Sequence, residues 1–435
     1  MRGRLALLLV PVAAAVIVTV YLARSGDAVF FVSLDTVRAD HLGCYGYASA
    51  RTPFLDGLAK SGTVFEHAIS SASFTPASHA SMFTGLYPWR HGVRFLWGFD
   101  ELRLKPEVGT LAELLRANGF ATGAFISSRP LQKQMYGLDR GFDIYDESFL
   151  VETPRPGRPR VSQLSNQRRA DETLAACLRW LQTPKPATFF AFVHLFDAHD
   201  SQVDPPPEFK RAYLARMKAG EDFNSYDFEI AWMDAQLGSF FDKVRPLIGR
   251  RRLLIIAVGD HGQGLSDHGY PRHGERLYQE EIRVPLIWSG AGIEEGRRVD
   301  TYVRTVDILP TIAEIYGFTP PAGIDGRSLV GVMRGEDTTD RISYSETLHP
   351  LSKDREALFA VIKGRRKIIY APQSGSIEYY DLAADPSELH DLAATGGYDD
   401  LLSELKKHDL STDFKRSRGS DPEIEEGLRA LGYVK

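Results

Sequence analysis

Cysteine is scarce in this chain of 435 residues, which contains only Cys44 and Cys177. Two cysteines exclude a disulfide framework, and their spacing leaves open whether they form a single bridge. The sequence also has no Cys-x-x-Cys pair and no cluster of cysteine and histidine spaced like a structural zinc site. A small fold held together by disulfides or by a cysteine-bound zinc ion is therefore excluded.

An excess of positive charge is also absent. The formal net charge is −5, and charged residues make up 25% of the chain. Proteins that bind nucleic acid usually show a basic face, so this balance gives no support to a nucleic-acid partner. Hydrophobic residues reach 43%, which argues against global disorder. The length suits one large α/β domain with a smaller appendage, and we find no internal repeats.

A long hydrophobic run lies at the N-terminus. Leu5–Ala23 is 19 residues without charge, and Arg2 and Arg4 precede it. A signal-peptide core has about 7–15 residues and a membrane-spanning helix about 20, and no clear cleavage site follows the run. We therefore predict that residues 1–27 form an uncleaved membrane anchor, which places the rest of the chain outside the cytoplasm, in the periplasm or at the cell surface. A cleaved signal peptide, which would give a secreted protein, and a buried core helix are the alternatives.

Residues 28–340 alternate short apolar runs with amphipathic segments. This alternation predicts an α/β fold in which helices sandwich a mainly parallel sheet. We expect buried strands at Ala28–Leu34, Ala121–Ile126, Thr188–Leu195, Leu253–Val258 and Val284–Trp288. We expect helices after Thr75 and at Pro53–Ser61, Thr110–Asn118, Asp171–Gln182, Asn224–Val244 and Val306–Tyr316. Three consecutive prolines indicate that Val203–Phe209 forms no regular element.

The pattern changes after about Arg341. Short strand-like runs, separated by glycine and proline turns, occupy Leu358–Ile362, Arg366–Tyr370 and Ile377–Asp381. They predict a small antiparallel α+β subdomain over residues 341–395. A polar tail over residues 396–435 follows it.

Polar side chains closely follow three of the expected strands. They are Asp35 after the first strand, His199 after the third, and Asp260 and His261 after the fourth. Ligands of an open parallel sheet bind beyond the carboxyl ends of its strands. We therefore expect these side chains to meet at one edge of the sheet.

Asp35, Asp260 and His261 form a mixed oxygen and nitrogen ligand set for one divalent metal ion. Calcium prefers oxygen ligands, whereas imidazole suits zinc or manganese, so we favour Zn²⁺ or Mn²⁺ over Ca²⁺. Gly259 and Gly262 flank the Asp-His pair and allow the backbone to approach a ligand closely. The alternatives are that Asp35 caps a helix and that Asp260-His261 is a turn with a surface histidine.

Thr75 is the candidate nucleophile. It precedes Pro76, a residue that favours the first turn of a helix. A hydroxyl at a helix N-terminus faces free N–H groups, which favour an anionic ester, and a bound divalent cation would lower the pKa of that hydroxyl. The alternative is that Thr75 only caps the helix. Ser73 and Ser78 are further candidates.

Three histidines, His199, His268 and His273, are candidates for orienting the anion or protonating the leaving group. Each taken alone could equally be structural, but their number near one edge of the sheet favours a pocket. Arg38 and Arg90 are candidates for binding anionic oxygens or for ion pairs that stabilise the fold.

Several segments resemble the sulfatase family of the alkaline-phosphatase superfamily. The first half of the resemblance lies in SLDTVRADHLGCYGY, TPFLDGLAKSGTVFEHA and SHASMFTGLYPWRHGV. The second half lies in GDHGQGLSDHG, ERLYQEEIRVPLIWSG, TVDILPTIAEIYGFTPPAGIDGRSL and YYDLAADPSELHDLA. Together they cover most of residues 28–395 in the family's order. The resemblance implies an alkaline-phosphatase-like fold and a metal-dependent hydrolase of sulfate or phosphate esters.

By position, the resemblance implies that Asp35, Asp260 and His261 are metal ligands and that Thr75 is the nucleophile held by the metal. His199 and His273 match positions near residues that contact the transferred group or the leaving group. These implied roles agree with those inferred from the residues alone.

The chain departs from the family at two places. Typical sulfatases have Cys-x-Pro-Ser-Arg or Ser-x-Pro-Ser-Arg where this chain has TPASH, and their Cys or Ser is oxidised to formylglycine. Threonine is not a substrate for that conversion, so we expect no formylglycine at Thr75, and His79 stands where the family has Arg. Superfamily relatives that act on phosphate groups use an unmodified threonine. Thr36 replaces a second carboxylate of calcium-binding sulfatases, which also favours zinc or manganese.

The sequence thus predicts a membrane-tethered, extracytoplasmic hydrolase of the sulfatase family. Thr75 would attack a sulfate or phosphate ester of a small molecule, a glycan or a lipid and form a covalent intermediate. Two alternatives remain at this point. One is a transferase that moves a phospho-headgroup with Thr75 as carrier, and the other is a catalytically inactive, sulfatase-like binding protein.

Overall fold

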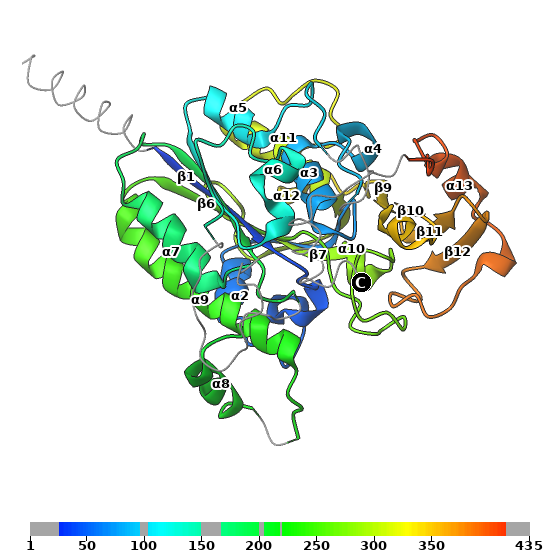
Figure 1. Ribbon diagram of the computed structural model, residues 1–435, viewed down its shortest axis with the longest axis horizontal. Helices are drawn as coiled ribbons and strands as arrows, with labels where there is room; N and C mark the ends of the chain where they lie inside the picture. Colours follow the sequence, from blue (N-terminus) through cyan, green and yellow to red (C-terminus); the bar gives the residue numbers. More distant parts are fainter. Residues whose placement is uncertain (1–25, 96–102, 149–166, 200–203, 218–219, 415–435) are drawn as a thin grey trace, which may run out of the picture.

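The computed structural model describes residues 26–95, 103–148, 167–199, 204–217 and 220–414, which form two β-sheets and the helices around them (Figure 1). The large sheet has eight strands in the order β4-β3-β5-β1-β6-β7-β2-β8. They are β1 (Asp27–Leu34), β2 (Gly62–Ile69), β3 (Ala121–Phe125), β4 (Ile144–Asp146), β5 (Phe189–Leu195), β6 (Arg252–Gly259), β7 (Arg283–Gly290) and β8 (Arg297–Arg304). Strand β7 pairs antiparallel with both of its neighbours, and the other pairs are parallel.

Helices cover both faces of the large sheet (Figure 1). One face packs against α2 (Pro53–Lys60), α7 (Ala170–Leu181) and α9 (Ser225–Ile248). The other face packs against α3 (Thr75–Thr84), α5 (Leu111–Ala117) and α11 (Ile308–Tyr316). The helices α4 (Pro88–His91), α6 (Lys133–Tyr136), α10 (Gln279–Ile282) and α12 (Val330–Met333) have one turn each, and α8 (Pro207–Leu214) has eight residues.

Strand β1 lies in the middle of the sheet and is buried on both faces, as its uninterrupted apolar sequence requires. Phe30 faces α9, where its ring meets those of Phe240 and Phe241 edge-on with centroids 5.8 and 5.2 Å away. Phe31 faces the opposite side and meets Phe83 of α3 at 6.0 Å. Successive residues of this one strand thus pack both helical layers against the sheet.

The small sheet is antiparallel, with the strand order β12-β11-β10-β9. Its strands are β9 (Ser343–Thr347), β10 (Leu358–Lys363), β11 (Arg366–Ala371) and β12 (Ser376–Asp381). Helix α13 (Asp399–Leu405) lies within the predicted polar tail, yet it packs against this sheet through buried Leu401 and Leu405. The small sheet and α13 therefore share an apolar cluster that also includes Tyr87, Phe95 and Val306.

The structure confirms the predicted α/β fold with a mainly parallel sheet and a small antiparallel sheet. The expected strands and helices are present, but β2, β4, β8 and β9 were not predicted. In β8 (RRVDTYVR) the apolar residues are separated by charged ones, because this strand lies at the sheet edge and is partly exposed. The exclusion of a regular element over Val203–Phe209 was wrong, since α8 begins at Pro207, where the missing N–H is not needed.

The predicted membrane anchor falls on residues 1–27, of which residues 1–25 lie outside the described part of the chain. Among the residues that the structure describes, no helix combines the length and the apolarity needed to cross a bilayer. The anchor therefore stays a prediction from the sequence.

A buried carboxyl group connects two helices on one face of the sheet. Asp234 of α9 accepts the backbone N–H groups of Phe54 (3.0 Å) and Leu55 (2.8 Å) at the start of α2. Burial raises the pKa of Asp234 from its usual 3.8 to about 7. Between about pH 4 and pH 7 the unfolded chain therefore loses a proton that the folded chain retains, so the stability contributed by this group falls as the pH rises.

We predict that Asp234→Asn weakens this pH dependence. As the pH rises from about 4 to about 7, the unfolding free energy of the wild type should fall relative to that of the variant by up to about 4 kcal/mol. One pKa unit corresponds to about 1.4 kcal/mol. Urea denaturation at several pH values measures the difference. Asp242→Asn, an exposed position on the same helix, is the control. A difference between wild type and Asp234→Asn that stays constant with pH would contradict the prediction.

Candidate active site

The carboxyl ends of β1 and β6 bring two aspartates together. Leu34 of β1 and Gly259 of β6 are partners in the parallel register, so Asp35 and Asp260 leave the sheet at the same edge. Both side chains are fully buried. The arrangement follows from strand pairing, as the sequence predicted for residues that end neighbouring parallel strands.

Thr75 reaches this pair from the first turn of α3. Its Oγ1 donates to Oδ2 of Asp35 at 3.3 Å and lies 3.2 Å from Nε2 of His261. The residue preceding the helix is Phe74, which has an extended backbone, and no side chain caps the helix there. The hydroxyl of Thr75 is therefore directed at the carboxylate and the imidazole instead of at the backbone of its own helix.

The hydrogen bonds of His261 fix its tautomer. Its Nδ1 lies 2.9 Å from the carbonyl oxygen of Gly262, which can only accept, so Nδ1 carries the proton. The lone pair of Nε2 then points into the cluster, 3.4 Å from Oδ2 of Asp260. A neutral histidine in this orientation has the nitrogen that a transition metal binds.

Each aspartate has one oxygen that is held by donors and one that is not. Oδ1 of Asp260 accepts the backbone N–H groups of Thr36 (3.1 Å) and His261 (2.8 Å). Oδ1 of Asp35 and Oδ2 of Asp260 are buried and have no hydrogen-bond partner among the described residues. Burial raises the pKa of Asp35 to about 7, and burial together with the neighbouring Asp35 raises the pKa of Asp260. Two buried carboxyl groups with unused oxygens are costly unless something positive lies between them.

A divalent cation fits this donor set. One ligand atom from each of Asp35, Asp260 and His261 lies within 4.8 Å of the other two. The unused carboxylate oxygens and the Nε2 lone pair converge there, and Oγ1 of Thr75 could supply a fourth atom. Two carboxylates, one imidazole and one hydroxyl are donors of the kinds that divalent metal ions bind in proteins.

The turn after β1 is strained. Thr36 has a φ of 58°, a conformation that β-branched residues rarely adopt. Three contacts hold it: its hydroxyl donates to the carbonyl oxygen of Asp35 (2.7 Å), its N–H donates to Asp260, and Tyr226 donates to its carbonyl oxygen (2.6 Å). Strain of this kind is typical of functional sites, and here it places Asp35 beside Asp260.

Two of the three predicted catalytic histidines lie at the cluster. The ring centroid of His273 is 4.5 Å from that of His261, and the ring of His199 lies 4.7 Å from that of His273. Nδ1 of His273 is 2.6 Å from Oε1 of Gln263, whose amide nitrogen donates to a carbonyl oxygen, so Nδ1 carries the proton. Burial lowers the pKa of both His199 and His273 well below the usual value.

His268 does not take part in this arrangement, contrary to the prediction. Its Nδ1 lies 2.6 Å from Oε1 of Glu280, and its Nε2 lies 3.0 Å from the carbonyl oxygen of Glu388. Both partners are acceptors, so both nitrogens donate, and these contacts raise the pKa of His268 against the effect of burial. Its ring also stacks on Tyr278 at 3.7 Å. This histidine connects the segment after β6 to the C-terminal part of the chain.

Two other histidines of the site, His79 and His194, had no role predicted from the sequence. His79 of α3 donates from Nδ1 to the carbonyl oxygen of Thr75 (2.7 Å) and accepts from Ser33 at Nε2 (2.8 Å). Nε2 of His194, on β5, lies 2.8 Å from Oδ2 of Asp35. Burial lowers the pKa of His79 to about 3 and that of His194 to about 4, so both are neutral. A polar residue inside the apolar run FFAFVHL was the only signal for His194.

The two arginines named from the sequence form ion pairs. Arg38 contacts Asp40 (2.7 Å) and Asp267 (2.8 Å), and Arg90 contacts Asp325 (2.6 Å). Arg38 is buried, and its three hydrogen-bonded nitrogens are used by these carboxylates and by a carbonyl oxygen. Both arginines are engaged by carboxylates, so we assign neither arginine to the anion.

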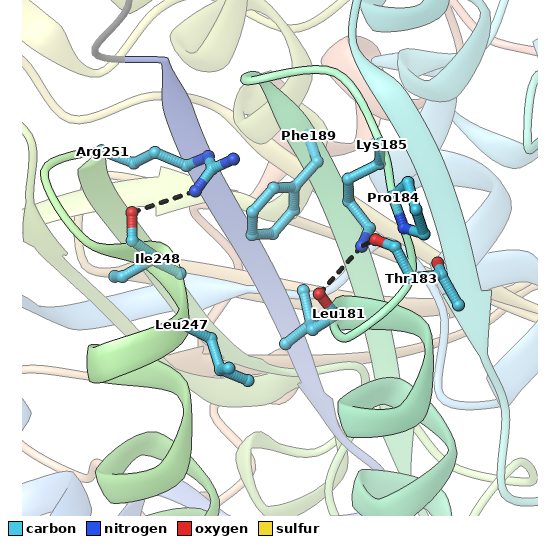
Figure 2. A pocket seen from close by; sticks show the side chains of 8 residues that line it. All are labelled: Leu181, Thr183, Pro184, Lys185, Phe189, Leu247, Ile248 and Arg251. Atoms are coloured by element: carbon cyan, nitrogen blue, oxygen red, sulfur yellow. Dashed lines mark hydrogen bonds between the residues drawn. The ribbon is translucent and has the colours of Figure 1, made fainter.

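A pocket of about 210 Å³ lies at the opposite end of the large sheet, where β5 begins (Figure 2). Two cations line it, but each is bound to the C-terminal turn of a helix. Lys185 donates to the carbonyl oxygen of Leu181 (2.9 Å), and Arg251 donates to that of Ile248 (3.1 Å). Because its charges already neutralise helix ends, this pocket offers no chemistry comparable to the Asp35 cluster.

Comparisons with known proteins cover most of the chain. The family model described as Sulfatase matches residues 27–318, and the model described as N-sulphoglucosamine sulphohydrolase, C-terminal, matches residues 267–413. The Delta 4,5-hexuronate-2-O-sulfatase of Bacteroides thetaiotaomicron is 25% identical, over 85% of this chain and 86% of the relative. Arylsulfatase A of Homo sapiens is 26% identical, over 94% of this chain and 87% of the relative.

Solved structures agree on the fold. The phosphonate monoester hydrolase of Agrobacterium radiobacter superposes with a TM-score of 0.65 at 22% identity, covering 88% of this chain and 94% of that one. The Sulfatase model spans the large sheet from β1 through α11 and includes every residue of the cluster. Since that model alone matches more than half of the chain, this protein belongs to the sulfatase family.

Proposed function

We propose that this protein hydrolyses anionic esters by attack of the Thr75 hydroxyl, with a covalent threonyl ester as the intermediate. The observation that carries the proposal is the position of Oγ1 of Thr75. It lies 3.3 Å from Asp35 and 3.2 Å from His261, beside two buried carboxylate oxygens that no donor holds. A hydroxyl with only a capping role would have no reason to face this cluster.

The chain's own groups account for the first proton transfer. Oγ1 of Thr75 donates to Oδ2 of Asp35, so the carboxylate is placed to accept the hydroxyl proton as Oγ1 attacks sulfur or phosphorus. A bond from Oγ1 to that centre forms while the bond to the alcohol oxygen breaks. Water then attacks the threonyl ester, releases sulfate or phosphate, and returns a proton to Oγ1.

Asp35, Asp260, His261 and Thr75 are the residues that would hold the metal ion. A divalent cation bound there would neutralise charge that develops on the non-bridging oxygens of the ester and would lower the pKa of the hydroxyl. In the absence of a cation, burial and the neighbouring Asp35 raise the pKa of Asp260 and so disfavour its ionised form.

His199 and His273 are the candidates for protonating the leaving alcohol. Burial keeps both neutral, and the negative charge of a bound ester would oppose that effect by favouring the imidazolium. His273 is the nearer of the two to the cluster, because its ring contacts that of His261. His268 has both nitrogens engaged elsewhere, so we do not propose it as an acid.

Sulfate esters are the substrates that family membership favours. The two sequence relatives described above are named as sulfatases, one of them a hexuronate-2-O-sulfatase, whereas the solved structure described above is a phosphonate monoester hydrolase. The unmodified threonine favours phosphate, because a threonyl sulfate lacks the second hydroxyl with which formylglycine expels sulfate. The proposed substrate is such an ester of a glycan, a lipid or a small molecule. It would lie outside the cytoplasm, where the chain is anchored to the membrane through residues 1–27.

We predict that Thr75→Ala abolishes turnover of aryl sulfate and aryl phosphate, while Thr75→Ser retains it. Loss of the nucleophile should lower kcat at least about 1,000-fold, whereas serine keeps the attacking oxygen. Initial rates with both substrates measure the effect. Turnover by Thr75→Ala at the wild-type rate would remove Thr75 from the mechanism.

Mass spectrometry gives an independent result for the same residue. The peptide that contains Thr75 should have the mass of unmodified threonine at rest and of a threonyl sulfate or phosphate after rapid quenching with substrate. Detection of the adduct on another residue would contradict the proposal. Transfer of a phospho-headgroup to an acceptor without net hydrolysis would favour the transferase, and tight binding of an anion without turnover would favour a binding protein.

We predict that removing the metal with a chelator abolishes turnover, and that Zn²⁺ or Mn²⁺ restores it better than Ca²⁺. Asp260→Asn should weaken metal binding by more than about 100-fold, the upper end of what changes outside the ligand shell cost. Equilibrium dialysis with elemental analysis measures the binding. Asp300→Asn, at a side chain that is 75% exposed, is the control and should bind metal normally. Full activity in the chelated protein would rule out metal dependence.

A further inference from the structure

His194 is completely buried at the carboxyl end of β5, between the Asp35 cluster and the apolar core. In the sheet it pairs with Ser33 of β1, two residues before Asp35. Its ring meets the ring of His79 edge-on, with centroids 5.3 Å apart. Its hydrogen bonds indicate what it does.

The backbone fixes the tautomer of His194. Nδ1 lies 3.3 Å from the backbone nitrogen of Ser127, and an amide N–H can only donate, so Nδ1 has no proton. The proton of the neutral ring is therefore on Nε2, which lies 2.8 Å from Oδ2 of Asp35. The hydroxyl of Ser127 also donates to the carbonyl oxygen of His194 (2.5 Å), which holds the two segments in place.

This hydrogen bond makes the two oxygens of Asp35 different. Oδ2 accepts from both His194 and Thr75, whereas Oδ1 has no partner among the described residues. A carboxylate held by two donors on one oxygen cannot rotate to exchange its oxygens without breaking both bonds. The orientation of Asp35 is thus set by two donors on one face of the sheet, His194 of β5 and Thr75 of α3.

We propose that His194 is a positioning residue that keeps Oδ1 of Asp35 turned toward a divalent cation and Oδ2 within reach of the Thr75 hydroxyl. The inference rests on the proposed function, because it takes Asp35 as a metal ligand. Histidine acts here as a hydrogen-bond donor to a ligand and not as a ligand itself. Residues with this task usually change metal affinity by 10–100-fold when they are replaced.

A purely structural histidine would give a different result from a positioning one. Replacing a buried side chain that has only a structural role lowers the stability of the fold. The metal affinity of the molecules that remain folded is then unchanged. Substitution by glutamine and by asparagine distinguishes a positioning role from a structural one, because both side chains end in an amide but differ in length. The amide nitrogen of Gln can replace Nε2 of histidine, whereas that of Asn is too short to reach Asp35.

The test compares His194→Gln and His194→Asn in the full-length protein after removal of metal. Competition with a chromogenic chelator measures the Kd for Zn²⁺, and circular dichroism confirms that each metal-free variant is folded. We expect His194→Asn to bind Zn²⁺ about 10–100-fold more weakly than the wild type and His194→Gln to bind close to it. Equal affinity in all three proteins, or equal weakening in both variants, would overturn the inference.

The measurement does not depend on turnover, so it separates this inference from the proposed function. If the Thr75→Ala variant turned over substrate, Thr75 would not be the nucleophile. The effect of His194 on metal affinity would remain. Wild-type affinity in His194→Asn would remove the positioning role and leave the Thr75 mechanism untouched. If the wild-type protein binds neither Zn²⁺ nor Mn²⁺, both the metal site and the role of His194 are wrong.

Discussion

The parallel pairing of β1 with β6 is the constraint on which the rest of the site depends. Its register sets Leu34 opposite Gly259, and the next residue of each strand is an aspartate. A shift by one residue would turn one of these carboxylates to the other face of the sheet. The apolar residues of both strands prevent such a shift, because Phe30 and Phe31 pack into different helical layers.

Bringing two carboxyl groups into a buried cluster is unfavourable, and the surrounding groups show how the fold tolerates it. Backbone N–H groups hold one oxygen of Asp260, and His194 and Thr75 hold one oxygen of Asp35. The neighbouring histidines are neutral, so they add donors without adding charge. In this sulfatase-family hydrolase the positive charge that the two carboxylates require would therefore come from a cation, because the neighbouring His79 is neutral.

The sequence predicted the architecture well where strands are buried on both faces. Continuous apolar runs such as AVFFVSL and LLIIAV have one stable environment, the middle of a helix-covered sheet. It predicted poorly where strands lie at an edge, as for β8, because a half-exposed strand mixes charge with apolar residues. The antiparallel direction of β7 could not be predicted either, because an apolar run has the same composition in either direction.

For the site, the sequence by itself determined which polar residues follow the strands and which hydroxyl begins a helix. That was enough to name Asp35, Thr75, Asp260 and His261 together. Only the tertiary structure decided the parts played by His194 and His268. Their partners, Ser127 and Glu388, are 67 and 120 residues away in the chain. Local patterns record helices, strands and their ends, whereas a hydrogen bond between distant segments exists only after packing has placed its donor and acceptor.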